Sequence, residues 1–317
     1  MPLKINSPTF SVTITPERGG DIVQIVDLES DVPLLSVSPT ASVTSPASVA
    51  NDSMTRWLTG YPGGWQFLTP NAGPDRDHDG VRQGYHGESA LSVWTVQDSS
   101  PSSAVLSARL VTAPLELTRY IEVTEEIAVT DTVRNLSPDP VSVRMVQHPA
   151  FGSPFLDKRS YLMTDAGTMI SDAEAPGNMV AANVHGAPSD LLPAGPTPAS
   201  FQLPGVGARR SLFAALTDFP DEQPSVFFAS PTRGFGVEMS WRRSSYPMAW
   251  LWVEANGIQG WPWFRRMFAV AVEPANVLPG EGVATNGMPR GGNGTTIDGG
   301  DAHISTVRLR RRPLTRA

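Results

Sequence analysis

The 317-residue chain contains no cysteine, so disulfide bonds and thiolate metal sites are excluded. No apolar run reaches the length of a membrane span, and residues 1–15 lack the uninterrupted apolar segment of a secretory signal. Basic residues are in the minority, with 24 Lys and Arg against 31 Asp and Glu. The net charge of −7 argues against nucleic acid or an anionic membrane as a partner, and we expect a cytoplasmic protein.

Helical periodicity is also scarce, whereas apolar and polar residues alternate with a period of two in many short segments. The 30 prolines and 28 glycines form no repeat and bound these segments as turns. We predict strands over residues 9–15, 22–28, 91–97, 104–112, 116–123, 125–134, 141–148, 211–217, 225–230, 234–241, 248–254, 265–273 and 302–310. Such a succession of strands indicates an all-β protein.

The connections between these strands indicate one domain over residues 1–317. Residues 36–56 and 157–209 are rich in loop-forming residues but not charged enough to be free linkers, so we interpret both as excursions of that domain. The second leaves room for an irregular strand or two. Residues 135–140 separate two alternating runs and are expected to form a hairpin turn.

Two candidate reactive side chains, His148 and Glu273, each directly precede a proline. Proline keeps the preceding residue out of the helical region, so we expect both on extended backbone at strand ends. Side chains alternate along a strand, which places His148 on the more polar face of residues 141–148. In residues 265–273 the bulky even positions face the core and leave Glu273 beside small alanines on the other side.

Trp250 and Trp252 share a face of the predicted strand 248–254 with Glu254. Their flat rings suit the C–H faces of a sugar, because they combine a large apolar area with a polar N–H. Taken singly, a histidine or glutamate before proline and a pair of tryptophans each have an ordinary structural explanation. The functional interpretation therefore depends on their occurring together.

Five segments resemble, in order and spacing, the aldose 1-epimerase (galactose mutarotase-like) family. They are ERGGDIVQIVD (17–27), GYPGGWQFLTPNAG (60–73), YHGE (85–88), VRNLSPDPVSVRMVQHPAFGSPFL (133–156) and WLWVEANGIQGWPWFRRMFAVAVEPAN (250–276). The resemblance implies a large antiparallel β-supersandwich with an open sugar groove and no required cofactor. It also implies an aldose 1-epimerase, which interconverts the α and β anomers of an aldose.

The resemblance implies roles for individual residues as well. His148 matches the family's general acid and Glu273 its general base. An imidazole titrating near ~6.5 and a carboxylate near ~4.3 suit these roles at neutral pH. The residues assigned to substrate binding are His86, Arg82, Asn71, Gln147, Trp250 and Trp252.

The chain departs from the galactose-type pattern at two places. Gln147-His148-Pro149-Ala150-Phe151-Gly152 replaces an Asn-His-Ser/Thr-Tyr-Phe-Asn-like motif, and the mid-chain acidic ligand has no clear match, with Asp218 and Glu238 as candidates. The identity of the sugar therefore stays open. We expect a small-molecule sugar as partner, and a homodimer is left open.

Three alternatives remain at this point. A metal-dependent sugar isomerase or lyase would use His86, Glu88, His148 and Glu273 as ligands. A carbohydrate-binding protein would keep the groove without turnover. A phosphosugar would be bound through Arg76, Arg82 or Arg144.

Overall fold

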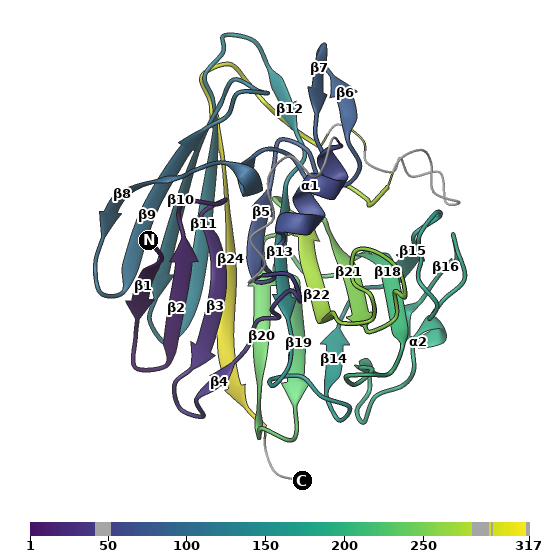
Figure 1. The fold of residues 1–317 in the computed structure, drawn as a ribbon. Helices are drawn as coiled ribbons and strands as arrows, with labels where there is room; N and C mark the ends of the chain where they lie inside the picture. The colour runs from purple at the N-terminus through teal and green to yellow at the C-terminus, as the bar shows by residue number, and fades with distance from the viewer. Residues whose placement is uncertain (42–51, 281–291, 293, 315–317) are drawn as a thin grey trace.

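The computed structural model describes residues 1–41, 52–280, 292 and 294–314. Antiparallel strands make up 49% of the structure and helices 5%, which confirms the all-β prediction. Most strands belong to two large sheets, which form the two layers of a sandwich (Figure 1). Within the described ranges, none of the helices has the length and apolar character to cross a membrane.

The first sheet has eleven described strands in the order β1-β2-β3-β5-β13-β22-β21-β18-β15-β16, with β4 paired to β3. Their bounds are β1 Leu3–Asn6, β2 Phe10–Thr15, β3 Asp21–Asp27, β4 Val32–Pro33, β5 Trp65–Leu68, β13 Val146–Phe151, β15 Thr168–Ser171, β16 His185–Gly186, β18 Arg210–Thr217, β21 Met248–Ala255 and β22 Phe268–Ala275. Strands β13, β22 and β21 lie side by side in its middle.

The second sheet has nine described strands in the order β17-β14-β19-β20-β24-β11-β10-β9-β8. Their bounds are β8 Thr95–Ser99, β9 Ser103–Arg109, β10 Leu115–Val123, β11 Glu126–Asn135, β14 Tyr161–Thr164, β17 Ser200–Gln202, β19 Ser225–Ser230, β20 Phe235–Trp241 and β24 Ala302–Pro313. The smaller elements are β6 Arg76–His78, β7 Val81–Gln83, β12 Val141–Val143, β23 Thr295–Ile297, α1 Ser53–Gly60, η2 Ser89–Leu91 and α2 Pro188–Leu191.

The buried apolar residues form one large cluster between the sheets, a second on the outer face of the first sheet, and a small third cluster of Ile170, Ala215 and Leu278. Strand β22 contributes to the first two clusters, because its side chains alternate. Val270 and Val272 lie in the first cluster, and Ala269 and Ala271 lie in the second. Small alanines on the outer face leave room above the sheet.

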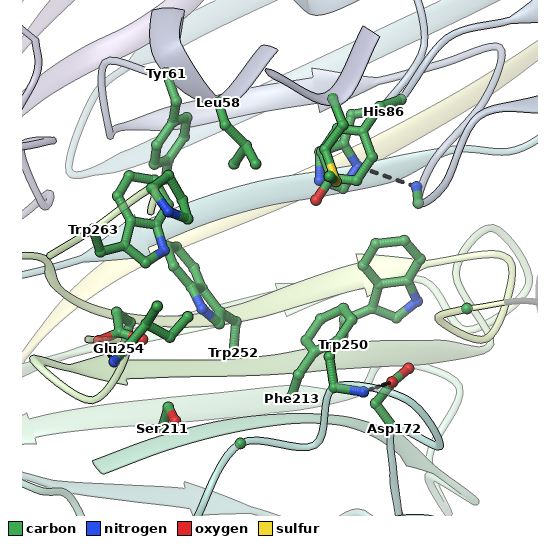
Figure 2. A pocket seen from close by; sticks show the side chains of 18 of the residues that line it. Leu58, Tyr61, His86, Asp172, Ser211, Phe213, Trp250, Trp252, Glu254 and Trp263 are labelled. Carbon is green, nitrogen blue, oxygen red and sulfur yellow. Dashed lines mark hydrogen bonds between the residues drawn. The ribbon is translucent and has the colours of Figure 1, made fainter. Parts of the chain in front are cut away.

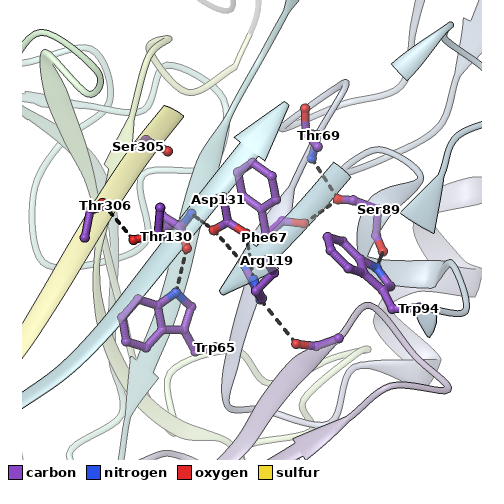
Figure 3. Close-up of polar contacts among 12 residues, drawn as sticks. Trp65, Phe67, Thr69, Ser89, Trp94, Arg119, Thr130, Asp131, Ser305 and Thr306 are labelled. Atoms are coloured by element: carbon purple, nitrogen blue, oxygen red, sulfur yellow. Dashed lines mark hydrogen bonds and ion pairs between the residues drawn. The ribbon is translucent and has the colours of Figure 1, made fainter. Parts of the chain in front are cut away.

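A polar network is buried in the space between the sheets (Figure 3). The guanidinium of Arg119 on β10 binds both carboxylate oxygens of Asp131 on β11, with distances of 2.8 and 3.0 Å. The amide of Gln147 on β13 donates to the same carboxylate at 2.7 Å and accepts from Trp65 Nε1 at 2.8 Å. The network thus connects the two sheets through strand β13.

Several predicted boundaries were wrong. Residues 141–148 form two strands, β12 and β13, which pair with β23 and with β5 and β22. The predicted hairpin at 135–140 is absent, because β11 pairs with β10 and β24 instead of β12. Residues 157–209 hold four strands and α2, and α1 begins inside the predicted loop 36–56, of which residues 42–51 lie outside the described residues.

Candidate active site

A cavity of about 620 Å³ opens on the outer face of the first sheet, above β13, β22, β21 and β18 (Figure 2). Helix α1 covers one side of it with Trp57 and Leu58. This helix starts at Asp52, whose carboxylate accepts the N–H of Thr55 at 2.7 Å as an N-cap. The aromatic residues that line the cavity are Trp57, Tyr61, Tyr85, Phe213, Trp250, Trp252, Trp261 and Trp263.

His148 and Glu273 face this cavity from the adjacent strands β13 and β22. These strands pair at Val146 with Ala275 and at Ala150 with Ala271, and this register sets His148 opposite Glu273. No ladder pair forms at that point. The following residues, Pro149 and Pro274, have no N–H to donate, which accounts for the interruption.

Both strands continue through these prolines, so the prediction that they end at His148 and Glu273 was wrong. Proline is compatible with extended backbone, and only its hydrogen-bonding capacity is lost. The two side chains that carry candidate proton chemistry therefore lie in the interior of the sheet, on rigid backbone, at a gap in its hydrogen-bond ladder.

The Nε2 atom of His148 lies 3.5 Å from Oε1 of Glu273. Neither carboxylate oxygen of Glu273 nor Nδ1 of His148 has a hydrogen-bond partner among the described residues, and the 3.5 Å contact lacks hydrogen-bond geometry. Burial lowers the pKa of His148 to about 4 and raises the pKa of Glu273 well above its usual value. Each group therefore favours its neutral form.

His86 approaches the pair from the loop before η2, with a ring centroid 6.1 Å from that of His148. Its φ of +58° is rare for a residue with a side chain. Nδ1 of His86 accepts the N–H of Gly73 at 3.1 Å, so the ring proton sits on Nε2. Burial lowers the pKa of His86 well below its usual value, which makes His86 a fixed neutral donor.

Trp250 and Trp252 also line the cavity, as the face assignment from sequence predicted. The indole N–H of Trp250 donates to Val277 O at 2.7 Å, which fixes the ring, and the residue is buried at the edge of the cavity. Phe213 meets Trp250 edge-on at 5.7 Å between centroids. Trp252 packs against Trp263 at 6.1 Å and against the His148 ring at 5.7 Å.

Asn71, Arg82 and Gln147 do not line the cavity. Asn71 is buried and holds the loop that carries His86, because its amide donates to Pro74 O and Gly84 O at 2.8 Å. Arg82 is exposed and pairs with Asp75 and Asp77. Gln147 points to the opposite face of β13 from His148, into the network between the sheets.

The two carboxylates considered from the sequence as acidic sugar ligands also lie outside the cavity. Asp218 and Glu238 lie away from the cavity, and Glu238 pairs with Arg312 at 2.6 Å. Sequence reasoning missed Asp172 and Glu174 as carboxylates that line it. Glu254, which the sequence placed on the face of Trp250 and Trp252, also lines it.

The geometry does not assemble the metal site considered above. Glu88 turns away from the two histidines and accepts the N–H groups of Val111 and Thr112 at 2.7 and 2.8 Å. Among the residues that the structure describes, no group of three or more His, Cys, Asp and Glu has the arrangement of a metal site.

The fold is similar to that of solved structures of galactose mutarotase-like proteins, which confirms the fold that the sequence resemblance predicted. The galactose mutarotase related enzyme of Lactobacillus acidophilus is 14% identical, with a TM-score of 0.69 over 99% of this chain and 98% of its own. The GalM/aldose epimerase homologue of C. elegans is 14% identical, with a TM-score of 0.66 over 99% of each chain. The Slr1438 protein of Synechocystis sp. PCC 6803 is 15% identical, with a TM-score of 0.70 over 99% of this chain and 96% of its own.

Within this fold class, residues 2–287 match the model of the family described as "Domain of unknown function (DUF4432)". The chain therefore belongs to the DUF4432 family. None of the curated proteins matches it.

Proposed function

We propose that this chain is an aldose 1-epimerase that interconverts the anomers of a neutral aldose. The observation that carries the proposal is the pairing of His148 and Glu273, 3.5 Å apart, at the floor of an aromatic cavity. The fold of the solved mutarotase-like proteins supports it.

The reaction needs a proton taken from the C1 hydroxyl and a proton given to the ring oxygen. The C1–ring-oxygen bond then opens, the C1–C2 bond rotates, and the ring closes on the other face of C1. Both exchanging oxygens are bonded to C1, so an acid and a base 3.5 Å apart can each contact one of them within hydrogen-bond distance.

The pair must hold one proton for this exchange. Burial raises the pKa of Glu273 and lowers that of His148, so before substrate binds the proton is favoured on the carboxyl. The sequence suggested the reverse, with a protonated imidazole as acid and a carboxylate as base. Because the exchange is reversible, one group donates when the ring opens and accepts when it closes, and the one-proton pair serves both directions.

Four carboxyl groups and two histidines line the cavity, and no Lys or Arg does so within the described part of the chain. Arg82 is engaged by carboxylates on the surface, and Arg144 binds Gly292 O and Asn71 Oδ1. A phosphorylated or carboxylated sugar would meet carboxyl groups there without a cation to bind it. A neutral sugar, packed against the aromatic lining and bound by His86, suits this cavity.

Anomer exchange is the direct test. Freshly dissolved single anomers of a panel of free and phosphorylated aldoses would be followed by polarimetry and by exchange NMR, with and without protein. We expect acceleration for at least one neutral aldose and none for its 6-phosphate. Tight sugar binding without acceleration of any member would reject the catalytic proposal and leave a carbohydrate-binding protein.

A further inference from the structure

The cavity extends beyond the acid–base pair along strand β21. Trp250, Trp252 and Glu254 project from the same face of this strand into the cavity. Trp250 lies opposite Glu273 in the ladder, whereas Glu254 lies opposite Ala269, four residues farther along. A strand rises about 3.3 Å per residue, so Glu254 is displaced by about 13 Å from the level of Glu273.

Glu254 is held in place and buried, with an exposed fraction of 0%. Its Oε1 accepts the N–H groups of Gly257 and Ile258 at 2.5 and 3.1 Å, in the turn that follows β21. Its Oε2 has no hydrogen-bond partner among the described residues. A buried carboxyl oxygen without a partner is costly in free energy, so a donor from outside the protein is expected there.

The space between the two ends of the cavity is built from flat apolar surface. Trp252 and Trp263 pack at 6.1 Å between centroids, and Figure 2 shows both beside Glu254, with Trp250 and His86 at the other end. Ser211 on β18 lies opposite Glu254 in the ladder and also lines the cavity. Aromatic faces with a carboxylate at the edge match a ring that carries hydroxyl groups.

We propose that Glu254, Trp252 and Trp263 form a second sugar subsite, and that the preferred substrate is a neutral reducing disaccharide. The assignment of its reducing ring to His148 and Glu273 rests on the proposed function. A single pyranose ring with a hydrogen bond on each side spans on the order of 10 Å. It cannot engage Glu273 and Glu254 together, because side chains stand roughly perpendicular to the sheet and keep the ~13 Å separation. A second ring, linked on the side away from C1, spans the remaining distance to Glu254. One of its hydroxyl groups donates a hydrogen bond to Glu254 Oε2.

Direct binding tests the subsite without relying on turnover. Calorimetric titrations would compare glucose and galactose with maltose, cellobiose and lactose, together with the methyl glycosides of the same disaccharides, which cannot exchange anomers. We expect at least one disaccharide to bind tenfold or more tightly than the monosaccharide of its reducing end. Binding of the methyl glycoside without any anomer exchange of the free sugar would support the subsite while rejecting the proposed reaction.

Three variants locate the effect. Glu254→Gln keeps an acceptor for the turn amides but removes the charge, and should weaken disaccharide binding about tenfold and monosaccharide binding less than twofold. Ile258→Trp keeps the turn N–H and fills the distal end, so it should affect only the disaccharide. Glu88→Gln is the matched control, because this carboxylate also accepts two backbone N–H groups but does not line the cavity. Equal affinity for mono- and disaccharides in the wild type, or equal losses for both in Glu254→Gln and Ile258→Trp, would overturn the proposal.

Discussion

Gln147 and His148 are neighbours on β13 but face two different regions. Buried polar groups are hydrogen-bonded in one region and lack partners in the other. Gln147 points between the sheets, where its amide donates to the carboxylate of Asp131. Arg119 binds the same carboxylate (Figure 3). His148 points into the cavity, where its Nδ1 and both oxygens of Glu273 lack hydrogen-bond partners among the described residues.

This difference in pairing distinguishes groups that stabilise the fold from groups that are available to a ligand. A buried polar group that is fully paired contributes to one well-defined arrangement of the fold. A buried polar group that is held in place but unpaired by the protein is an exception, and at a cavity a bound water or a ligand supplies the missing partner. The network between the sheets should therefore respond to mutation through stability, and the cavity through activity.

The largest expected effect is on the rate. Glu273→Gln and His148→Asn should each slow anomer exchange by roughly 10²–10⁴-fold, because each removes one partner of the proton transfer. Sugar affinity should stay within about tenfold, since proton transfer is made in the transition state. Stopped-flow polarimetry and calorimetry would measure the two quantities. Near-wild-type turnover of folded Glu273→Gln would show that Glu273 is not a partner in the proton transfer.

The next effect concerns the network. Arg119→Met leaves the buried carboxylate of Asp131 without its cation and should reduce the free energy of unfolding by about 3–5 kcal/mol. Urea titration followed by tryptophan fluorescence would measure it. The double variant Arg119→Met/Asp131→Leu removes both charges and should recover part of the loss. A negligible effect of the single variant would contradict the structural role of the network.

The pH dependence distinguishes the two protonation schemes of the cavity. As pH falls through about 4, His148 becomes protonated while Glu273 already carries a proton, so no base is left to accept the proton of the C1 hydroxyl. As pH rises through the raised pKa of Glu273, the last proton leaves and the acid is lost. A profile of kcat/KM should therefore keep its plateau well below the ordinary imidazole pKa of about 6.5. An acid limb centred near that value would instead indicate an unperturbed histidine.

The smallest expected effect is on the stability of a catalytic variant. Glu273 has a raised pKa in the folded state, so its contribution to stability is present at low pH and lost as pH rises above the unfolded value of about 4.3. Glu273→Gln stays neutral and should raise Tm by roughly 1–3 °C at neutral pH. Calorimetry near pH 4 should show little difference between the two proteins. A lower Tm for the variant at pH 7 would mean that the carboxylate is stabilised in the fold.

Much of the fold follows from period-two alternation. It predicted the inward faces of β21 and β22 correctly, with Leu251 and Val270 in the cluster between the sheets and Trp250 and Ala271 on the outer face. It missed β5, whose four residues are all buried, because a strand covered on both faces shows no alternation. The register between β13 and β22 was also beyond the sequence, since strand pairing over long separations leaves no local pattern.

The residues of the candidate site also fall into those that alternation could place and those that it could not. Residues on regular strands, such as His148 and Trp252, were placed from their faces. Trp57, Tyr61 and Trp263 reach the cavity from α1 and from loops, where no periodicity tells which way a side chain points. Arg82 and Gln147 were assigned to the site but lie outside it. Similarity of a motif does not reveal that Arg82 is bound by Asp75 and Gln147 by Asp131.

The setting of His148 against Glu273 has a consequence for how the site can vary among relatives. The pair is defined by strand register, and a shift of one residue turns every following side chain to the opposite face. One inserted or deleted residue within β13 or β22 would move the imidazole or the carboxyl into the layer between the sheets. Members of the family that keep this chemistry should therefore differ in β13 and β22 by substitutions only. Changes of length should be confined to the connections, such as the one that carries Trp263, where they would alter the lining of the cavity.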